Sequence, residues 1–402
     1  MSPAPPGDRD ATEAAADGAD RFARQRIIPG WDQPRLAAAT VVVIGTGALG
    51  NEVVKNLALA GVGRLVLCDP DVVAESNLSR TVLFSQADVG TPKATAAAVA
   101  LRRLWPQVAT EPRVADLVSG VGLGELADAD LVIGCVDSIR ARVQLLGRCA
   151  LAGARLLDGG TSPWGAELRV RLSPDEPCFG CTLTPHQRSV SDLPWSCAEP
   201  LPDERPQAAA IATTAVAAGW MCSVAFGLLF GTAPSYQVLS LDVTAGRAGP
   251  VSVARDPGCP LHRPLPSPLV ASPVSHRATV AEFLATLGPG DEAYTWTSFA
   301  MPPRCRRCGS PASGDAGAAA ACARCGATLR ESFSTRLRDA DPGRTLAGLG
   351  VAPAEILPVS SANDDLRGHR LREDPVQSGR VNRDNSDIHR GRKILRAETT
   401  GG

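Results

Sequence analysis

The 402-residue sequence has few aromatic side chains and almost no net charge. Because aromatics make up only 4% of the residues, Ala, Val and Leu must supply most of the packing. A formal net charge of −1 argues against a protein whose main partner is nucleic acid or an acidic membrane surface. With 44% hydrophobic and 21% charged residues, the composition is that of a globular protein with a well-filled core.

The sequence also lacks features of export and of membrane insertion. We find no uninterrupted apolar run that approaches the roughly 20 residues of a membrane-spanning helix. Residues 1–20 are rich in Ala, Pro, Asp and Glu, and no basic stretch there precedes an apolar one, so they do not resemble a secretion signal. We therefore expect a cytoplasmic protein with no membrane contact and a disordered N-terminus at residues 1–20.

Strand and helix patterns alternate within residues 21–265. Buried strands are expected at 40–45, 64–69 and 131–135, and helices at 48–60, 92–104 and 138–151. Continuous apolar strands that alternate with helices predict a parallel sheet covered on both faces. Further on, the patterns at 167–171 and 237–242 alternate, with an Ala-rich helix at about 207–230 between them. The fold class is therefore α/β, a Rossmann-like doubly wound and mostly parallel sheet with an antiparallel extension.

A glycine-rich turn predicts a nucleotide site. Gly45, Gly47 and Gly50 follow the first strand and open a helix, where backbone N–H groups can approach a phosphate. Asp69 ends the next strand, where a carboxylate can hold ribose hydroxyls. Taken alone, this pattern is typical of a nicotinamide-dependent redox protein.

The sequence after Asp69 favours a different chemistry. The residues that carry this interpretation are Asp69-Pro-Asp71-Val-Val73, Ser76-Asn77-Leu78 and Arg80, together with Arg24, Lys93 and Asp137. In order and spacing, from about residue 21 to 262, the chain resembles the ThiF/MoeB/HesA family of ubiquitin-activating-enzyme-like adenylyltransferases. The resemblance implies that ATP adenylates a carboxyl group, with Mg²⁺ as cofactor.

The resemblance also assigns roles to the polar residues. Arg80 and Lys93 would neutralise the phosphates, Asn77 would orient one of them, and Asp137 would hold Mg²⁺. Arg24 would reach the γ-phosphate from the partner subunit of a homodimer. The implied nucleotide-binding set is Gly45, Gly47, Ala48, Gly50, Asp69, Asp71, Asn77, Arg80, Lys93 and Asp137. Ala48 departs from the glycine that the family often has there, but alanine is small enough to let the backbone approach the nucleotide.

Twelve cysteines are many for a protein of a reducing compartment, and their spacing indicates zinc rather than disulfides. The family resemblance implies one structural zinc held by Cys178, Cys181, Cys259 and His262, the last a histidine where the family has cysteine. A second set is predicted from spacing alone and comprises Cys305, Cys308, Cys322 and Cys325. Each of its pairs is followed by a glycine that permits the knuckle turn, so we expect a zinc ribbon within residues 275–360.

One further cysteine is a candidate nucleophile. Family members that pass the acyl group to a thiol carry that cysteine in the loop before the long helix, where this chain has Cys197. The remaining cysteines, at 68, 135, 149 and 222, fall in apolar strand or helix patterns and are expected to be core. Cys197 can equally be a loop residue with no catalytic task.

Residues 361–402 are polar and are expected to form a disordered tail, which ends in Gly401-Gly402. The leading hypothesis is adenylation of the C-terminal carboxylate of a small sulfur-carrier or ubiquitin-like protein that ends in glycine. The alternatives are adenylation of a ribosomal peptide, a nicotinamide-dependent redox protein, and an adaptor that binds partners through its zinc ribbon. The sequence does not name the acyl substrate, and the role of the terminal di-glycine stays open.

Overall fold

The computed structural model describes residues 20–188, 210–301, 305, 307–310, 321–327, 332–363 and 365–374. A first compact unit spans Met1–Arg372, and a second comprises Glu373–Gly402. All helices and strands of the described residues belong to the first unit. Its helices are α2 (Ala23–Arg26), α3 (Gln33–Ala38), α4 (Ala48–Ala60), α5 (Lys93–Leu104), α6 (Leu117–Gly120), α7 (Leu123–Asp128), α8 (Ile139–Ala152), α9 (Pro185–Arg188), α10 (Ile211–Phe230) and α11 (Val280–Leu284). Short 3₁₀ turns are η1 (Glu75–Asn77), η2 (Gln86–Asp88), η3 (Phe179–Thr182), η4 (Leu337–Asp339) and η5 (Ala347–Leu349).

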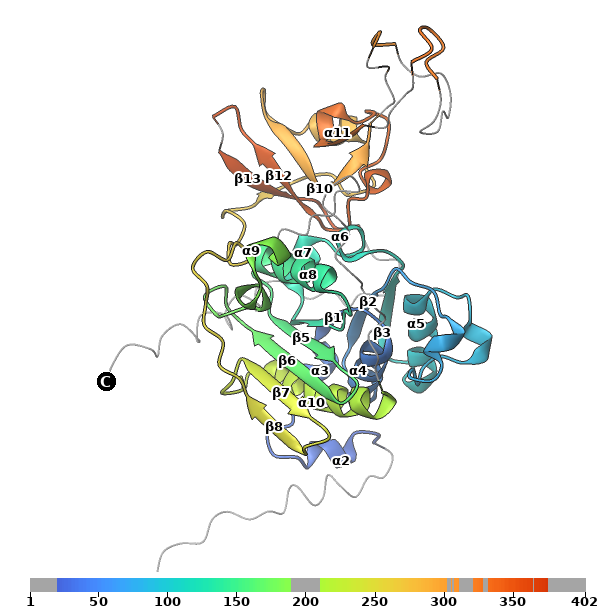
Figure 1. Cartoon of the computed structure of the whole chain (residues 1–402), viewed down its shortest axis with the longest axis vertical. Coiled ribbons are helices and arrows are strands. Elements are labelled where there is room, and N and C mark those ends of the chain that lie inside the picture. The colour runs from blue at the N-terminus through green and yellow to red at the C-terminus, as the bar shows by residue number, and fades with distance from the viewer. Residues whose placement is uncertain are drawn as a thin grey trace, which may run out of the picture. The chain divides into compact units, whose positions relative to one another are not determined.

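An eight-stranded sheet organises the larger part of this unit (Figure 1). Its strands are β1 (Thr40–Ile44), β2 (Arg64–Cys68), β3 (Ala109–Arg113), β4 (Leu131–Gly134), β5 (Leu156–Thr161), β6 (Gly165–Arg171), β7 (Val238–Asp242) and β8 (Arg247–Pro250). Their order is β3-β2-β1-β4-β5-β6-β7-β8, parallel from β3 to β5 and antiparallel from β5 to β8. The predicted Rossmann-like sheet with an antiparallel extension is therefore confirmed.

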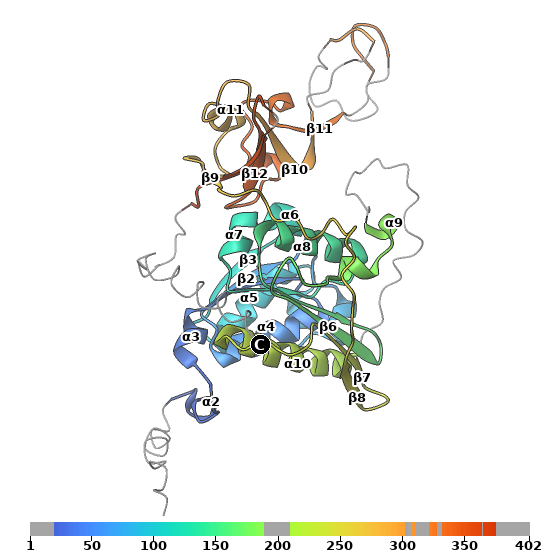
Figure 2. The ribbon, with the colours of Figure 1, turned by 90° about the vertical axis from the view of Figure 1, so that its left-hand side faces the viewer.

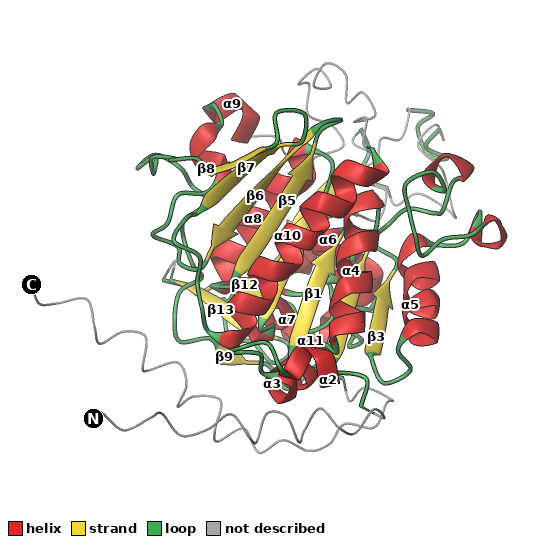
Figure 3. Ribbon diagram, turned by 90° about the horizontal axis from the view of Figure 1, so that it is seen from below, coloured by secondary structure: helices red, strands yellow, loops and turns green. Residues whose placement is uncertain are grey.

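The sheet is covered on both faces. Alternate residues of one strand point to opposite sides, so Val41 and Val43 enter one core while Val42 and Ile44 enter the other. On the first face pack α4, α5 and α10, and Figure 3 shows α4 and α10 lying across the strands. On the second face lie α6, α7 and α8. This is the two-sided cover that continuous apolar strands require.

Helix α10 corrects one sequence-based expectation. Its 20 residues are long and apolar enough to cross a membrane by length and composition, whereas we expected no such run. Half of that apolar window is buried inside the unit, and α10 packs against α4, β5 and β6. The helix is therefore part of the core of the α/β domain.

A second, five-stranded sheet forms the C-terminal part of the first unit (Figure 2). Its strands are β9 (Val270–Ala271), β10 (Glu292–Ala300), β11 (Phe333–Arg336), β12 (Ile356–Ser360) and β13 (Leu366–Arg370), in the order β11-β10-β12-β13-β9. The residues that bear the second cysteine set lie between β10 and β11. Strand β13 pairs with β12 and falls within the segment from residue 361 that we expected to be a disordered tail. The sheet therefore extends past the expected boundary at 360.

Candidate active site

A cavity of about 350 Å³ opens where the parallel strands end, between β1 and β4. Such a point, where the strand order reverses, is the usual ligand site of an open α/β sheet. The predicted residues that line it are Gly45, Gly47, Ala48, Asp69, Asp71, Asn77, Arg80, Lys93 and Asp137. Gly50 and Arg24 are not among its lining residues, and Arg24 is exposed on α2. The fold thus gathers most of the predicted nucleotide set around one cavity.

The three glycines of the turn have different reasons to be glycine. Gly45 has φ +89°, and a Cβ there would lie 2.5 Å from the Cys135 carbonyl oxygen. A Cβ on Gly50 would lie 2.0 Å from the Gly45 carbonyl oxygen, so this glycine lets α4 pack against the turn. Gly47 faces open space at the start of α4. It leaves room for an anion beside the first N–H groups of that helix.

The carboxylate of Asp69 holds the turn in place. Its Oδ2 accepts hydrogen bonds from the Thr46 N–H (2.7 Å) and hydroxyl (3.0 Å), and its Oδ1 accepts from the Asp71 N–H (2.9 Å). Asp69 is only 4% exposed. It therefore positions the glycine turn, in addition to lining the cavity.

Two cationic side chains that line the cavity, and the amide of Asn77, are held by neighbouring groups. Lys93, the first residue of α5, forms an ion pair with Asp71 at 2.7 Å. Arg80 donates to the Ser76 carbonyl oxygen at 2.8 Å, and the Asn77 side chain accepts from the Ala74 N–H at 2.9 Å. Two cations and an amide thus line the same cavity as Gly47, a combination that suits a chain of phosphates.

The structure adds residues that the sequence analysis missed. Asp116 lines the cavity and caps α6 by accepting from the N–H groups of Val118 (2.8 Å) and Ser119 (3.1 Å). Gln144 and Thr161 line it as well. No motif marks these residues, since Asp116 follows β3, a strand that we did not predict.

Arg142 is a further missed residue, and it binds backbone groups of the cavity wall. It pairs with Asp158 and donates to the carbonyl oxygens of Val136 (2.9 Å) and Gly159 (3.2 Å), both of which line the cavity. Burial raises the pKa of Asp158, although the neighbouring Arg142 opposes this shift. Arg142 therefore ties the end of β4 to the end of β5. Its guanidinium lies 5.5 Å from the ring centre of Phe179.

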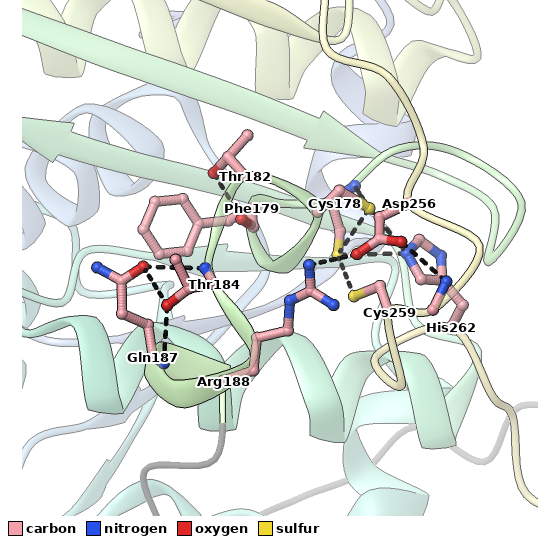
Figure 4. Close-up of polar contacts among 11 residues, drawn as sticks. Cys178, Phe179, Thr182, Thr184, Gln187, Arg188, Asp256, Cys259 and His262 are labelled. Carbon is pink, nitrogen blue, oxygen red and sulfur yellow. Dashed lines mark hydrogen bonds and ion pairs between the residues drawn. The ribbon is translucent and has the colours of Figure 1, made fainter.

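The four side chains of the first predicted metal set lie close together (Figure 4). Cys178 Sγ lies 3.9 Å from Cys181 Sγ, 3.8 Å from Cys259 Sγ and 3.5 Å from His262 Nε2. A tetrahedral zinc site with bonds of roughly 2.3 Å spaces its sulfur ligands about 3.8 Å apart. The other ring nitrogen of His262 contacts the Pro174 carbonyl oxygen at 2.6 Å, which turns Nε2 toward the thiols. These four side chains therefore fit a zinc ion.

A salt bridge links α9 to the segment at 256–262, which carries the ligands Cys259 and His262. Arg188 pairs with Asp256, whose Oδ1 accepts from the Gly258 N–H at 2.8 Å, next to Cys259 (Figure 4). Arg188 is the last described residue before 189–209, which include Cys197 and lie outside the described residues. The guanidinium of Arg188 therefore supports the loop that carries Cys259.

The second metal set is assembled separately. Cys305 Sγ lies 3.5 Å from Cys325 Sγ, and Cys308 Sγ lies 3.6 Å from Cys322 Sγ. All four ligand atoms lie within 4.8 Å of one another. Gly309 and Gly326 have φ +69° and +68°, the left-handed turn that the sequence required after each pair. This set also fits a zinc ion.

The cysteines expected in the core are buried. Cys68 and Cys135 contribute to the cavity wall, yet burial raises the pKa of the Cys68 thiol to about 12 and also raises that of Cys135. Burial raises the pKa of both Cys149 and Cys222 to about 12. All four thiols are therefore protonated near neutral pH and poorly suited as nucleophiles.

Residues 21–261 match the ThiF family. The chain belongs to the ThiF family. A sulfur carrier protein adenylyltransferase of Thermus thermophilus is 33% identical over 257 residues, which cover 60% of this chain and 90% of that protein. The molybdopterin-synthase adenylyltransferase of Escherichia coli is 38% identical over 165 residues, covering 40% of this chain and 66% of that protein. The predicted family resemblance is thus confirmed, and a nicotinamide-dependent enzyme loses its support.

Other ThiF relatives are longer or more distant. The mouse adenylyltransferase and sulfurtransferase MOCS3 is 38% identical over 174 residues, which cover 40% of this chain and 36% of that protein. The chain thus spans about a third of the length of that relative. The crystal structure of E. coli MccB matches with a TM-score of 0.50 at 18% identity, covering 62% of this chain and 74% of that one. This likeness shows the fold alone.

Proposed function

We propose that the chain uses ATP to adenylate the C-terminal carboxylate of a small sulfur-carrier or ubiquitin-like protein. The observation that carries the proposal is the gathering of Gly47, Arg80, Lys93 and Asp137 around one cavity of a ThiF-family domain. The Thermus relative, which this chain covers over 90% of its length, is named for adenylation of a sulfur carrier. We assign that activity to this chain on the strength of both.

The chemistry requires little more than positioning and charge. Attack by a carboxylate on the α-phosphate of ATP forms an acyl-adenylate and expels pyrophosphate. Arg80 and Lys93 neutralise the phosphates, while the N-terminal turn of α4 at Gly47 receives one of them. Asp137, which lines the cavity, would hold Mg²⁺, and the ion would supply further positive charge at the phosphates.

The test is ATP–pyrophosphate exchange with candidate carriers. Asp137→Ala should lower exchange by about two orders of magnitude or more, because positive charge at the phosphates is lost. The matched control is Asp175→Ala, a carboxylate outside the lining of the cavity. If Asp137→Ala exchanges pyrophosphate as the wild type does, with the cognate carrier present, the assignment is wrong. Exchange that a short peptide supports and no carrier protein supports would favour the alternative acyl substrate.

The proposal includes two zinc ions per chain, one for each ligand set, and a reducing compartment such as the cytoplasm, in which the thiols stay free. Both sets have the spacing of a tetrahedral site, which supports zinc over disulfides. Their zinc content is measured by metal analysis of the purified protein.

We further propose a homodimer in which Arg24 enters the cavity of the other copy. Two observations support this. Arg24 is exposed and does not line the cavity of its own chain. Helix α10 presents an apolar face on which Ile211, Val216 and Trp220 are 46%, 47% and 40% exposed. An apolar face of that kind fits a second copy of the chain.

Mixing two inactive chains tests the shared site. Arg24→Ala and Asp137→Ala chains should together regain about a quarter of wild-type exchange after random reassociation, because half of the dimers then hold one intact composite site. Trp220→Glu should dissociate the dimer in light scattering, whereas Trp164→Glu serves as the control, because Trp164 lies outside α10 and is more exposed, at 62% against 40% for Trp220. A Trp220→Glu monomer that adenylates at the wild-type rate would refute the shared site.

A further inference from the structure

The loop before β12 of the C-terminal sheet contacts the α/β domain at close range. A Cβ on Gly122 would lie 2.1 Å from the Pro353 carbonyl oxygen, and one on Gly124 would lie 2.5 Å from that of Ala354. The Gly124 N–H donates to the Ala354 carbonyl oxygen at 3.0 Å. Glycine at 122 and 124 is therefore what lets the loop at 353–355 approach the backbone before and within α7.

The docking loop has a conformation that needs outside support. Ala354 has φ +51°, which is unfavourable for a residue with a side chain, and it is buried. Such a backbone persists only where its surroundings fix it. Here the surroundings are the backbone of Gly122 and Gly124 on the α/β domain.

A buried ion pair fastens the same contact. Glu355 and Arg148 are 1% and 5% exposed, and their side chains meet at 2.6 Å. Glu355 also accepts from the Leu123 N–H at 3.0 Å, and Arg148 donates to the Val121 carbonyl oxygen at 2.8 Å. The pair thereby grips both sides of the junction between α6 and α7. A carboxylate and a guanidinium this deeply buried are costly to separate.

The segment that contains α6, which this ion pair contacts, also forms part of the wall of the proposed nucleotide cavity. Asp116 and Leu117, at the start of α6, line the cavity, and Leu117 belongs to the same core cluster as Ile356 of β12. Helices α6 and α7 have only four and six residues, so they have little regular structure of their own to hold this crossover in place. The C-terminal sheet supplies the support that a longer crossover helix would give.

We infer that the C-terminal sheet is a working part of the adenylating enzyme, because its Glu355–Arg148 contact positions the Asp116–Leu117 wall of the ATP cavity. Glu355 is thus a positioning residue that acts on the nucleotide through α6. This inference rests on the proposed function, since it takes ATP as the occupant of the cavity.

The test measures the affinity for ATP apart from turnover. With the whole chain, the dissociation constant of α,β-methylene-ATP is measured by calorimetry, and KM for ATP and kcat are measured by pyrophosphate exchange. Glu355→Gln keeps the shape of the side chain and removes its charge. We expect it to raise the dissociation constant and KM for ATP about fivefold or more, with kcat and the KM for the carrier little changed.

Two further variants keep the test decisive. Gly122→Ala places a methyl group against Pro353 and should weaken ATP binding in the same way, even if Glu355→Gln does not fold. Arg370→Gln breaks the exposed ion pair to Asp128 at the rim of the same interface and should leave ATP affinity unchanged. Folded Gly122→Ala and Glu355→Gln proteins that bind the analogue as tightly as the wild type would overturn the inference. A wild type that does not bind the analogue would instead refute the proposed function.

Discussion

The two cysteine clusters have nearly the same ligands but are built in opposite ways. In the first, Cys178 and Cys259 are 81 residues apart and both belong to the core of the α/β domain. In the second, Cys305 and Cys325 are 20 residues apart, and the hydrophobic cluster that they form within the described residues contains the other cysteines of the set and Ala327. A ligand set drawn from distant segments holds those segments together, whereas a local one holds only itself.

The first cluster is also connected to the nucleotide cavity. Phe179 lies between Cys178 and Cys181, and its ring is contacted by Arg142 at 5.5 Å and Arg169 at 5.0 Å. Arg142 in turn bonds to two carbonyl groups of the cavity wall. We therefore expect that loss of the first metal site would alter the cavity and lower the activity. Loss of the second should affect only the segment between β10 and β11.

The largest effect should follow Cys178→Ser. Loss of a structural metal from a core is among the few changes that cost more than about 4 kcal/mol of stability. We expect a large fall in the thermal midpoint and the loss of pyrophosphate exchange. Cys149→Ala is the matched control, since it removes a buried thiol from the same core without touching a ligand and should cost about 1 kcal/mol. A Cys178→Ser protein with the midpoint of the wild type would show that the metal does not hold the domain.

Cys305→Ser should affect metal content far more than stability. We expect the zinc content to fall from two ions to one per chain, while exchange stays at the wild-type rate. The free energy of unfolding of the α/β domain should change by no more than about 0.5 kcal/mol, and its thermal midpoint should therefore stay close to that of the wild type. A loss of exchange in this variant, with the first site still loaded, would contradict the comparison of the two clusters.

Sequence patterns predicted the parts of the fold that are apolar and continuous. The run at 40–44 has buried positions on both faces of the sheet, and this is why it was recognisable as a central strand. Strand β3 was missed because Glu111 and Pro112 interrupt it. At the edge of the sheet both are tolerated, and Glu111 is paired with Arg64 at 2.5 Å.

Strand β13 of the C-terminal sheet was missed for a related reason. The sequence of β13, Leu366–Arg370, is mostly polar, and only Gly368 and His369 are buried. Composition therefore suggested a disordered tail. The Glu355–Arg148 pair joins residues 207 positions apart, a separation at which a single sequence carries no sign of contact.

In contrast, the gathering of the motif residues around one cavity could be predicted, because a family motif fixes their order along the chain. Asn77, Arg80 and Lys93 lie on η1, on the loop after it and at the start of α5, and the fold returns them to one cavity. Asp116 and Arg142 support that cavity from outside the motifs we used. Their roles follow from which backbone groups they bind, and this is known only from the structure.

The smallest effect on the first chemical step should follow Cys197→Ala. By its position in the sequence, Cys197 is outside both predicted zinc sets. Of the four core thiols, Cys68 is the nearest to the glycine turn by sequence, and burial raises its pKa to about 12, so it is poorly suited to replace Cys197. An acyl-adenylate is reactive enough for capture by an accessible thiolate. If Cys197 accepts the acyl group, the variant should keep ATP–pyrophosphate exchange but lose any thiol-sensitive adduct with the carrier, as seen by non-reducing electrophoresis and intact mass. Cys149→Ala should keep both.

Should Cys197→Ala form the final product at the wild-type rate, the enzyme stops at the adenylate. That result would favour a peptide over a sulfur-carrier protein as the substrate that is adenylated.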